Sequence, residues 1–470
     1  MMTLNVKVSI ALVLLIASFI PTARAQTFRV PIMQFRLDNG LRVVVSEDHT
    51  APVVAVAVYY DVGSRDEALG RSGFAHLFEH MMFQGSENVG KAEHFVHVEK
   101  NGGYLNGSTH ADFTNYYQFL PANQLELALW LESDRMRSLK ITPANLRNQR
   151  EAVKEEKRLS IDNQAYWPAL NRMDEMIFRN WANSHSTIGS MRDLNAATIA
   201  DVRKFFDTYY APNNAVLVIV GDVDPGSSER LARKYFGSIP ARKAPPAVDV
   251  SEPFEVARRK SVVTDPQAQM PAVALAWKIP ARRDPDFYPL VLLKSILSDG
   301  ESSRLYRRLL KEKAVSIEIQ GFLDERRGPG SFTLFSIYKP ENSPERLQAE
   351  IEAEIELIKN HGVTEEELLK TRNQFRLEQF LGGDGGSEYE SLQTALGRAL
   401  ALGEYTLFDG DPSLINTELD RYLSVTREQV RDAARKYLGA KNRSVLYIRP
   451  ASPEPARPEN RKRAERGKGD

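Results

Sequence analysis

The chain has 470 residues, 42% of them hydrophobic, which is enough for two to four domains with sizeable cores. Its 62 basic and 62 acidic residues balance, so we expect neither nucleic acid nor stable membrane insertion among its main interactions. It contains no cysteine, which excludes disulfides, thiolate nucleophiles and Cys-ligated metals, and leaves His, Asp and Glu for any metal site.

The first 25 residues have the features of an export signal. Lys7 precedes an apolar run over 8–20, and Ala23 and Ala25 form an A-x-A cleavage pattern. A short membrane anchor is the alternative, but the run is too short to span a bilayer comfortably. We therefore predict a signal peptide over 1–25 and an exported protein, which in a bacterium with two membranes means a periplasmic one.

The first half then combines strand and helix patterns. Asp38-Asn39-Gly40 lies between two apolar runs, which is a strong hairpin signal. Apolar, β-branched runs predict buried strands, and apolar residues at helical spacing predict helices. In chain order we predict a hairpin over 35–48, a strand over 52–64, helices over 72–83, 123–139 and 145–160, and a strand over 215–223.

The second half repeats this order. PAVALAWKIP (271–280) resembles PVVAVAVYY (52–60), and SVLYIRP (444–450) resembles AVLVIV (215–220). The helical segments before these last two strands match as well. The economical interpretation is two copies of one domain, with chance similarity of buried strands as the alternative.

We therefore predict an α+β fold of two similar domains, each a mostly antiparallel sheet packed with helices, arranged as a clamshell. The Pro-rich stretch 241–253 carries no periodicity and predicts a linker between the halves. GGDGGS (382–387) predicts a mobile loop or only a turn. The resulting boundaries are a first domain over 26–240, a linker over 241–255, a second domain over 256–450 and a disordered tail over 451–470.

The stretch GFAHLFEHMMFQGS (73–86) carries the most specific motif, H-x-x-E-H. Residues four apart share one face of a helix, so His76 and His80 can present two imidazoles to one ion. Zinc suits such ligands and acidifies water. Glu79 lies near the same face, where it can act as a general base without ligating the metal. A packed or solvated histidine pair is the alternative.

A catalytic zinc site needs a third protein ligand. The segment QREAVKEEKR (149–158) offers Glu151, Glu155 and Glu156 on a predicted helix. Most charge runs are solvated helix faces, so the segment alone does not choose among them.

The sequence resembles the pitrilysin family of zinc metallopeptidases, the inverzincins, in its bacterial exported two-domain type. This family includes insulin-degrading enzyme and the mitochondrial processing peptidase. The likeness covers most of the chain after the signal. It includes LDNGLRVVVSED (37–48), GSRDE (63–67) just before the H-x-x-E-H motif, NGGYLNGSTHADFTNYY (101–117) and YYAPNNAVLVIVGD (209–222).

The resemblance implies one zinc ion per chain. Family members carry the third ligand about 76 residues beyond the second histidine, and counting from His80 gives Glu156, with Glu155 as the fallback. The family also has a supporting glutamate seven residues before that ligand. This chain has Gln149 there, a departure that puts part of the support for zinc in doubt.

The resemblance also implies that a peptide substrate adds as a strand to an exposed sheet edge. NGGYLNGSTHADFTNYYQF (101–119) is expected to form that edge. Gly102 and Gly103 would allow close backbone approach, and Asn106 would hydrogen-bond the substrate near the scissile carbonyl. The alternative for the two glycines is a turn after the preceding helix.

The second half has no H-x-x-E-H motif. Active family members supply an Arg and a Tyr from this half, beside the zinc, to bind substrate and stabilise the oxyanion. The matching positions here are Lys311-Glu312-Lys313 and Ile317, so the pair is missing. The resemblance then implies a heterodimer in which a paralogous subunit supplies the Arg–Tyr pair. The alternatives are a shifted alignment and an enzyme that works without the pair.

The favoured function is therefore a zinc-dependent endopeptidase that cleaves peptides or small unfolded proteins, with Glu79 as the base. The alternatives are a non-catalytic scaffold or partner-binding subunit of the same fold and, less in keeping with Glu79, a zinc-storage protein. Cleavage specificity, the physiological substrate and the partner's identity do not follow from the sequence.

Overall fold

The computed structural model of the chain describes residues 29–382 and 391–451. Contacts group the described residues from Ile32 onward into one compact unit. The predicted signal peptide (1–25), most of the GGDGGS segment, and all but the first residue of the predicted tail lie outside the described residues. No helix among the described residues is long and apolar enough to cross a bilayer.

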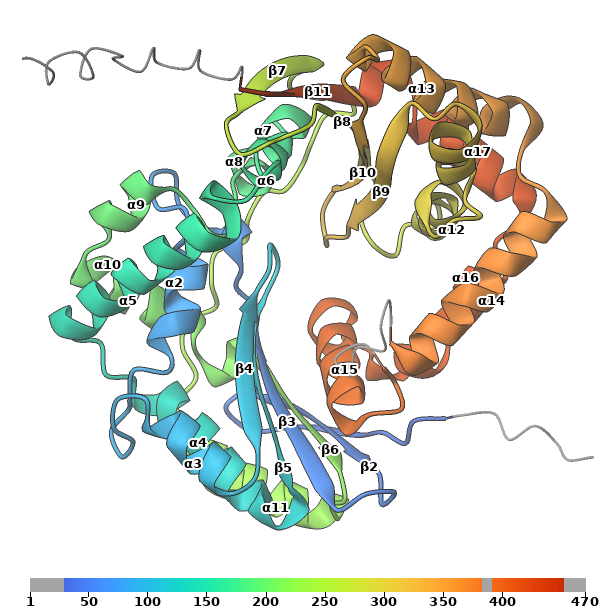
Figure 1. The fold of residues 1–470 in the computed structure, drawn as a ribbon. Coiled ribbons are helices and arrows are strands. Elements are labelled where there is room, and N and C mark those ends of the chain that lie inside the picture. The colour runs from blue at the N-terminus through green and yellow to red at the C-terminus, as the bar shows by residue number, and fades with distance from the viewer. Residues whose placement is uncertain (1–28, 383–390, 452–470) are drawn as a thin grey trace, which may run out of the picture. The chain divides into compact units, whose positions relative to one another are not determined.

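The first half of the described chain contains a six-stranded sheet of order β1-β2-β6-β3-β5-β4 (Figure 1). Its strands are β1 (Met33–Arg36), β2 (Arg42–Glu47), β3 (Val53–Tyr60), β4 (Tyr104–Thr109), β5 (Thr114–Pro121) and β6 (Ala215–Gly221). β2 and β6 are parallel, and every other pair is antiparallel. The edge predicted within 101–119 is β4, whereas β5 is an interior strand.

The predicted hairpin joins β1 to β2 through Asp38-Asn39-Gly40. Gly40 has φ +89°, a left-handed conformation that glycine adopts without strain. Asn39 Nδ2 donates to the carbonyl oxygens of Phe236 and Ile239, both at 2.8 Å. The turn is therefore fixed both by its own backbone and by the end of a distant helix.

The second half contains a five-stranded sheet within the described residues, of order β7-β11-β8-β10-β9. Its strands are β7 (Lys260–Asp265), β8 (Ala272–Ile279), β9 (Ser316–Asp324), β10 (Gly330–Tyr338) and β11 (Arg443–Pro450). β7 and β11 are parallel and the other pairs are antiparallel, which repeats the order β2-β6-β3-β5-β4 strand for strand. The predicted α+β class with two similar, mostly antiparallel domains is confirmed.

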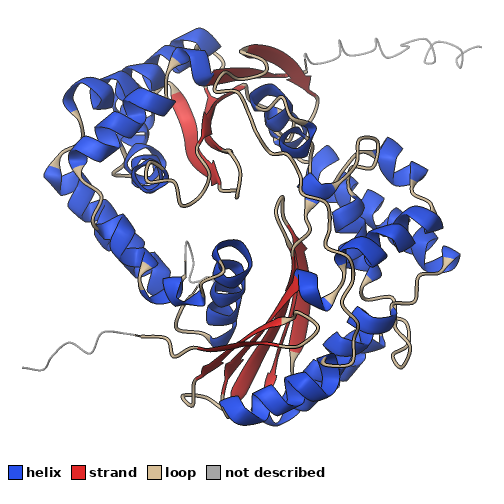
Figure 2. Cartoon of the chain, turned by 180° about the vertical axis from the view of Figure 1, so that it is seen from behind, coloured by secondary structure: helices blue, strands red, loops and turns tan. Residues whose placement is uncertain are grey.

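Helices cover these sheets (Figure 2). Those of the first half are α2 (Phe74–Met81), α3 (Glu93–Lys100), α4 (Leu125–Ser138), α5 (Pro143–Lys157), α6 (Trp167–Leu170), α7 (Met173–Ile177), α8 (Trp181–Ser184), α9 (Met191–Ala196), α10 (Ile199–Tyr209) and α11 (Pro225–Phe236). Those of the second half are α12 (Phe287–Ser298), α13 (Pro344–His361), α14 (Glu365–Leu381), α15 (Ala395–Asp409), α16 (Glu418–Leu423) and α17 (Arg427–Tyr437). The helices predicted over 72–83, 123–139 and 145–160 correspond to α2, α4 and α5.

The repeat extends to individual side chains. Thr198 and Thr426 cap α10 and α17 with the same reciprocal hydrogen bonds, each to the residue three positions later. Asn214 and Asn442 then precede β6 and β11, and each side-chain amide donates to the carbonyl oxygen of the last residue of the preceding helix. These matched contacts bear out two copies of one fold and leave chance similarity without support.

The two halves exchange a helical segment. α15 of the second half packs on β3 and β6 of the first sheet, on the face opposite α4 and α11 (Figure 1). Tyr59 Oη donates to the carbonyl oxygen of Leu400 (3.0 Å), and Arg42 Nη1 donates to that of Thr406 (2.9 Å). In return, α6 and α7 of the first half pack on the second sheet, in a shared cluster that includes Ala169, Met173, Met176, Ile177, Ala274, Ala276 and Leu446.

This exchange explains why β3 and β8 are apolar on both faces: each sheet is covered by helices of its own half on one face and by a segment of the other half on the other. Sequence periodicity predicted these strands but not what covers them. The domain boundaries over 26–240 and 256–450 stay predictions.

A substitution at Gly403 of α15 tests how closely α15 packs on β3. A Cβ at Gly403 would lie 2.3 Å from Cε2 of Tyr59, a ring that is 2% exposed and packs against Phe113. We expect Gly403→Ala to lower the free energy of unfolding by about 1–3 kcal/mol despite the better helix propensity of alanine, because the core has no room for the methyl group. Urea unfolding followed by circular dichroism measures this.

Gly439→Ala is the matched control. Gly439 has φ −85° and no heavy atom within 4 Å of the added Cβ, so its substitution should stay within about 0.5 kcal/mol of wild type. Equal unfolding midpoints for both variants would contradict the close packing of α15 on β3.

Candidate metal centre

Helix α2 has one apolar face and one face that carries His76 and His80. It begins after Gly73, where φ is +86° and a Cβ would lie 2.7 Å from the carbonyl oxygen of Ile188. Leu77, Phe78 and Met81 enter the hydrophobic core, and the Phe78 ring packs among the aromatic rings of α10 and the residue that follows it. This anchoring turns the histidines toward α5.

His76 and His80 lie one turn apart on α2, with ring centroids 4.9 Å apart and ring planes at 86°. Glu156 of α5 faces both. His76 Nε2 is 3.5 Å from Glu156 Oε1, and His80 Nε2 is 3.1 Å from Oε2. Over the described residues 29–382 and 391–451, these three are the group of His and acidic residues whose ligand atoms all lie within 4.8 Å of one another.

The neighbouring Glu155, the fallback third ligand, points elsewhere. Its carboxylate accepts a hydrogen bond from Arg158 at 2.8 Å and is largely exposed. Of the two glutamates, the geometry therefore brings Glu156 to the histidines.

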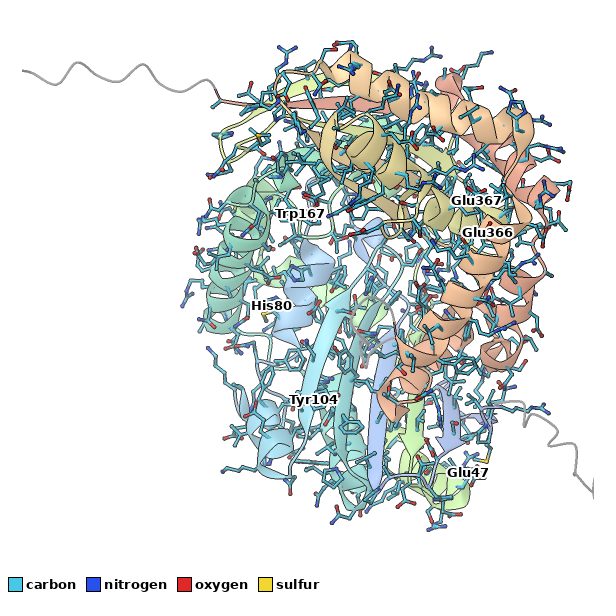
Figure 3. The ribbon with its side chains drawn as sticks, turned by 45° about the vertical axis from the view of Figure 1, so that its right-hand side comes forward. Glu47, His80, Tyr104, Trp167, Glu366 and Glu367 are labelled. Atoms are coloured by element: carbon cyan, nitrogen blue, oxygen red, sulfur yellow. The ribbon has the colours of Figure 1, made fainter. Side chains whose placement is uncertain are left out.

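Glu79 lies beside this group on α2, which contacts β4. Figure 3 labels His80 on α2 and Tyr104 on β4. Thr109 Oγ1 donates to Glu79 Oε2 at 2.6 Å. Gly107 shares the face of β4 with Thr109, and a Cβ at Gly107 would lie 3.2 Å from Glu79 Cγ. Strand alternation could have pointed to Gly107 and Thr109 as neighbours of the motif, but the sequence does not show that β4 faces α2.

Burial and charge set the protonation of the centre. Burial lowers the pKa of His76 to about 4, although Glu156 opposes this. Burial also acts to lower the pKa of His80, but the hydrogen bond that His80 donates to Glu156 and the negative charges of Glu156 and Glu79 together outweigh it, and the pKa is raised. That hydrogen bond in turn lowers the pKa of Glu156, and burial raises the pKa of Glu79 against the Thr109 hydrogen bond. A neutral imidazole and a carboxylate are the forms that bind metals.

Gln149, two helical turns before Glu156 on α5, is buried and lies within hydrogen-bonding reach of His80. Its Nε2 donates to Asn148 Oδ1 at 2.7 Å. The departure from the family pattern thus places a neutral amide, in place of a carboxylate, next to one of the histidines.

The three residues predicted to hold substrate lie at and near the start of β4. Gly102 (φ +77°) and Gly103 donate backbone N–H groups to the carbonyls of Glu99 and Val98, which ends α3. Asn106 is exposed on β4 and its side-chain oxygen accepts from the Gly107 N–H at 2.9 Å. The turn explains both glycines by local structure, and contact of these residues with substrate stays a prediction.

The predicted absence of an Arg–Tyr pair concerned the region around Lys311 and Ile317. Ile317 is an exposed residue of β9, and Lys311 lies in the short π-helical segment Tyr306–Glu312 before it. Elsewhere, a cavity of about 520 Å³ lies at the end of β4. His110, Asp112 and Phe113 line it, together with Arg282, Arg283, Glu325, Glu404, Tyr405 and Phe408 of the second half.

This cavity brings arginine and tyrosine side chains of the second half close to the residue that follows Thr109. The Arg283 guanidinium lies 5.0 Å from the centre of the Tyr405 ring, and Arg283 also pairs with Asp409 at 3.1 Å. The family motif did not predict Arg283 or Tyr405. It points to the region around Lys311 and Ile317, and these two residues lie elsewhere in the sequence.

Comparison with known proteins finds similarity to peptidases. A family profile described as "Insulinase (Peptidase family M16)" matches residues 42–186, which contain His76, Glu79, His80 and Glu156. A second profile, described as "Peptidase M16 inactive domain", matches residues 196–375.

Individual relatives cover most of the chain. "Zinc protease PqqE" of Helicobacter pylori is 32% identical over 339 residues, which are 72% of this chain and 76% of that protein. "Mitochondrial-processing peptidase subunit beta" of Lentinula edodes is 24% identical over 417 residues, which are 86% of this chain and 87% of that protein.

Among solved structures, a protease from Helicobacter pylori has a TM-score of 0.83 at 28% identity, covering 90% of this chain and all of that one (100%). An M16 inactive domain from Pseudomonas fluorescens has a TM-score of 0.77 at 18% identity, covering 90% and 98%, and this likeness concerns the fold alone.

Asp66, in the turn that precedes α2, makes the stability of the protein depend on pH. Burial raises its pKa from the ordinary 3.8 to about 7, although the Gly63 N–H donates to its Oδ2 at 2.9 Å. The native state therefore binds this proton more tightly than the unfolded chain does, so stability falls as pH rises from 4 to 7.

We expect Asp66→Asn to remove this loss of stability at higher pH. The amide stays neutral, and its oxygen can still accept a hydrogen bond from the Gly63 N–H. As pH rises from 5 to 8, the free energy of unfolding of the variant should increase by about 2 kcal/mol relative to that of wild type. Urea unfolding at both pH values measures the difference. Parallel pH profiles for the two proteins would contradict the raised pKa of Asp66.

Proposed function

The chain belongs to peptidase family M16, the insulinase family, and from this premise we propose that it is a zinc-dependent endopeptidase that cleaves peptides or small unfolded proteins. The observation that carries the proposal is the convergence of His76, His80 and Glu156 from two helices, with Glu79 beside them but outside the group.

The donor set fits zinc. Two imidazole nitrogens and one carboxylate are the ligands of catalytic zinc sites, and such sites keep a further position open. Burial favours the neutral form of His76, and Glu156 retains its negative charge through its hydrogen bond with His80. We propose one zinc per chain, held by these three residues. When bound, zinc polarises a carbonyl group and makes water more acidic.

Glu79 supplies the proton transfers. Thr109 holds Glu79 Oε2, which leaves Oε1 to take a proton from the attacking water and later to deliver it to the leaving amine. Because Thr109 belongs to β4, the strand that would bind the peptide also orients the base.

The substrate is proposed to be an extended peptide that adds to β4. Within the described residues, β4 pairs only with β5, so its outer edge offers backbone hydrogen-bonding groups. Asn106 is exposed on this strand. A chamber between clamshell halves would admit unfolded chains and exclude folded proteins.

A paralogous partner subunit is proposed to supply the missing Arg–Tyr pair, because Lys311, Lys313 and Ile317 occupy the matching positions. The alternative is a chain that works alone, and the placement of Arg283 and Tyr405 beside the end of β4 favours it. Export to the periplasm is a further part of the proposal and rests on the N-terminal sequence.

The rival function is a non-catalytic scaffold subunit. The match of residues 196–375 to the inactive-domain profile is compatible with it. That match lies outside the metal centre, however, and a scaffold would have no use for Glu79 or its hydrogen bond with Thr109.

Replacement of Glu79 tests the catalytic proposal. Glu79→Gln should lower the kcat for hydrolysis of an unstructured peptide pool by about 100- to 10,000-fold, because an amide cannot accept the proton. Zinc content should be unchanged. The assay uses the purified chain alone and together with a co-expressed paralogous subunit, and Glu155→Gln serves as the control with full activity. Turnover that survives Glu79→Gln in both preparations would refute the assignment.

A second pair of variants tests the metal ligands. Glu156→Gln should weaken zinc binding by more than about 100-fold, since the loss of a ligand exceeds the 10- to 100-fold effect of outer contacts. Glu155→Gln should leave the dissociation constant unchanged, because that carboxylate faces Arg158. Competition with a chromophoric zinc chelator measures both. The reverse order of effects would make Glu155 the third ligand.

A further inference from the structure

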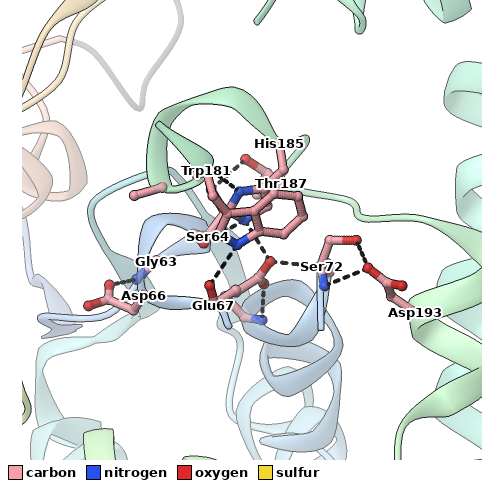
Figure 4. A network of polar contacts seen from close by, with 12 residues as sticks. Gly63, Ser64, Asp66, Glu67, Ser72, Trp181, His185, Thr187 and Asp193 are labelled. Carbon is pink, nitrogen blue, oxygen red and sulfur yellow. Dashed lines mark hydrogen bonds and ion pairs between the residues drawn. The ribbon is translucent and has the colours of Figure 1, made fainter. Parts of the chain in front are cut away.

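Helix α2 begins without a cap of its own. Its N-cap position is Gly73, which has no side chain to accept from the first N–H groups. Glu67 accepts them instead: Oε2 from the Gly73 N–H at 2.8 Å, and Oε1 from the Ala75 N–H at 2.7 Å (Figure 4). One carboxylate, six residues before the N-cap, thus satisfies two donors at the start of the helix.

The Glu67 side chain is 0% exposed, so its charge needs a partner. His185 provides one, with Nε2 at 3.0 Å from Glu67 Oε2. The ring nitrogens of His185 also lie 2.6 Å from the Trp181 carbonyl oxygen and 2.7 Å from that of Ser64. Carbonyl oxygens only accept hydrogen bonds, so both nitrogens carry protons and His185 is an imidazolium.

The surrounding residues fix this ion pair in place. The indole of Trp181 stacks on the His185 ring with centroids 4.2 Å apart and planes at 8°, and its Nε1 donates to the Glu67 carbonyl oxygen at 2.9 Å. Asp193 Oδ2 accepts from both the backbone N–H and the hydroxyl of Ser72, just before α2 (Figure 4). Residues more than one hundred positions later in the chain therefore define where α2 begins.

We propose that Glu67 is a positioning residue for the metal centre, which acts with His185 to set the first turn of α2 and so the position of His76 relative to Glu156. The inference rests on the proposed function in one respect, that the centre binds zinc. Ala75, whose N–H Glu67 holds, directly precedes His76. Functional groups in such sites must stay within about 0.5 Å of their productive positions, so a loosened first turn displaces one ligand of three.

The test is Glu67→Gln in the full chain. The amide has one acceptor oxygen for two N–H groups, and it leaves the His185 cation without a counter-charge. We expect the zinc dissociation constant, measured by chelator competition, to rise about 10- to 100-fold. Hydrogen exchange of the metal-free protein should speed up at least about tenfold over residues 73–81, with the second sheet unchanged.

Glu418→Gln is the matched control. Glu418 is also buried, with its side chain 6% exposed, and it pairs with Arg283 in the second half. This variant should lower the urea midpoint without changing zinc affinity or exchange over 73–81. If both variants lost zinc affinity equally, the effect of Glu67→Gln would be explained by a general loss of stability. That result would overturn the proposal.

Trp181→Phe provides a milder variant in case Glu67→Gln does not fold. It keeps the stacking on His185 but removes the indole donor, and should shift both readouts in the same direction by about two- to fivefold. Unchanged exchange over 73–81 in the variants that fold overturns the inference even if wild type binds no zinc. Absence of zinc binding by wild type refutes the proposed function, while faster exchange would still uphold the role of Glu67 in α2.

Discussion

The contact between α2 and α5 is the interaction on which the candidate site depends. One short helix carries two imidazoles and a carboxylate, but no residue of that helix can complete the group. The third side chain must come from a second helix held at a fixed distance. The apolar face of α2, centred on Phe78, secures that distance by packing into the aromatic cluster of the first core. The buried Glu67 fixes the other end of the same helix.

Much of this arrangement could be predicted from the sequence, and the parts that could not be predicted have a physical reason. Periodicity identified the strands, and helical spacing put His76 and His80 on one face. Family spacing chose Glu156 over Glu155, a choice that composition could not make because both lie in one charged run. The Glu67–His185 pair escaped prediction because its members lie 118 residues apart and neither belongs to a periodic pattern. The hydrogen bond from Thr109 likewise depends on which strand ends up beside α2.

The two halves show how one fold can carry a candidate metal centre or lack one. α12 follows β8 as α2 follows β3, but its residues, FYPLVLLKSILS, are apolar on nearly every side. Leu290, Leu293 and Leu297 are fully buried, and the helix contacts α14, α16 and α17. Such a helix stabilises a core and has no face left for ligands. The chemistry therefore belongs to particular side chains on the fold and not to the fold itself.

The exchanged segments, α15 and α6–α7, bear on how the chain arose. α15 lies between α14 and α17, and α6–α7 lie between α5 and α10, so the same part of each repeat crosses to the other sheet. A single ancestral repeat could have covered its sheet by reciprocal exchange with an identical copy, in a two-fold symmetric dimer. Duplication and fusion would preserve that dimer within one polypeptide. In such a fused chain, one copy could do without the histidines and glutamates that α2 and α5 carry, because the other copy would still need it to cover an apolar face.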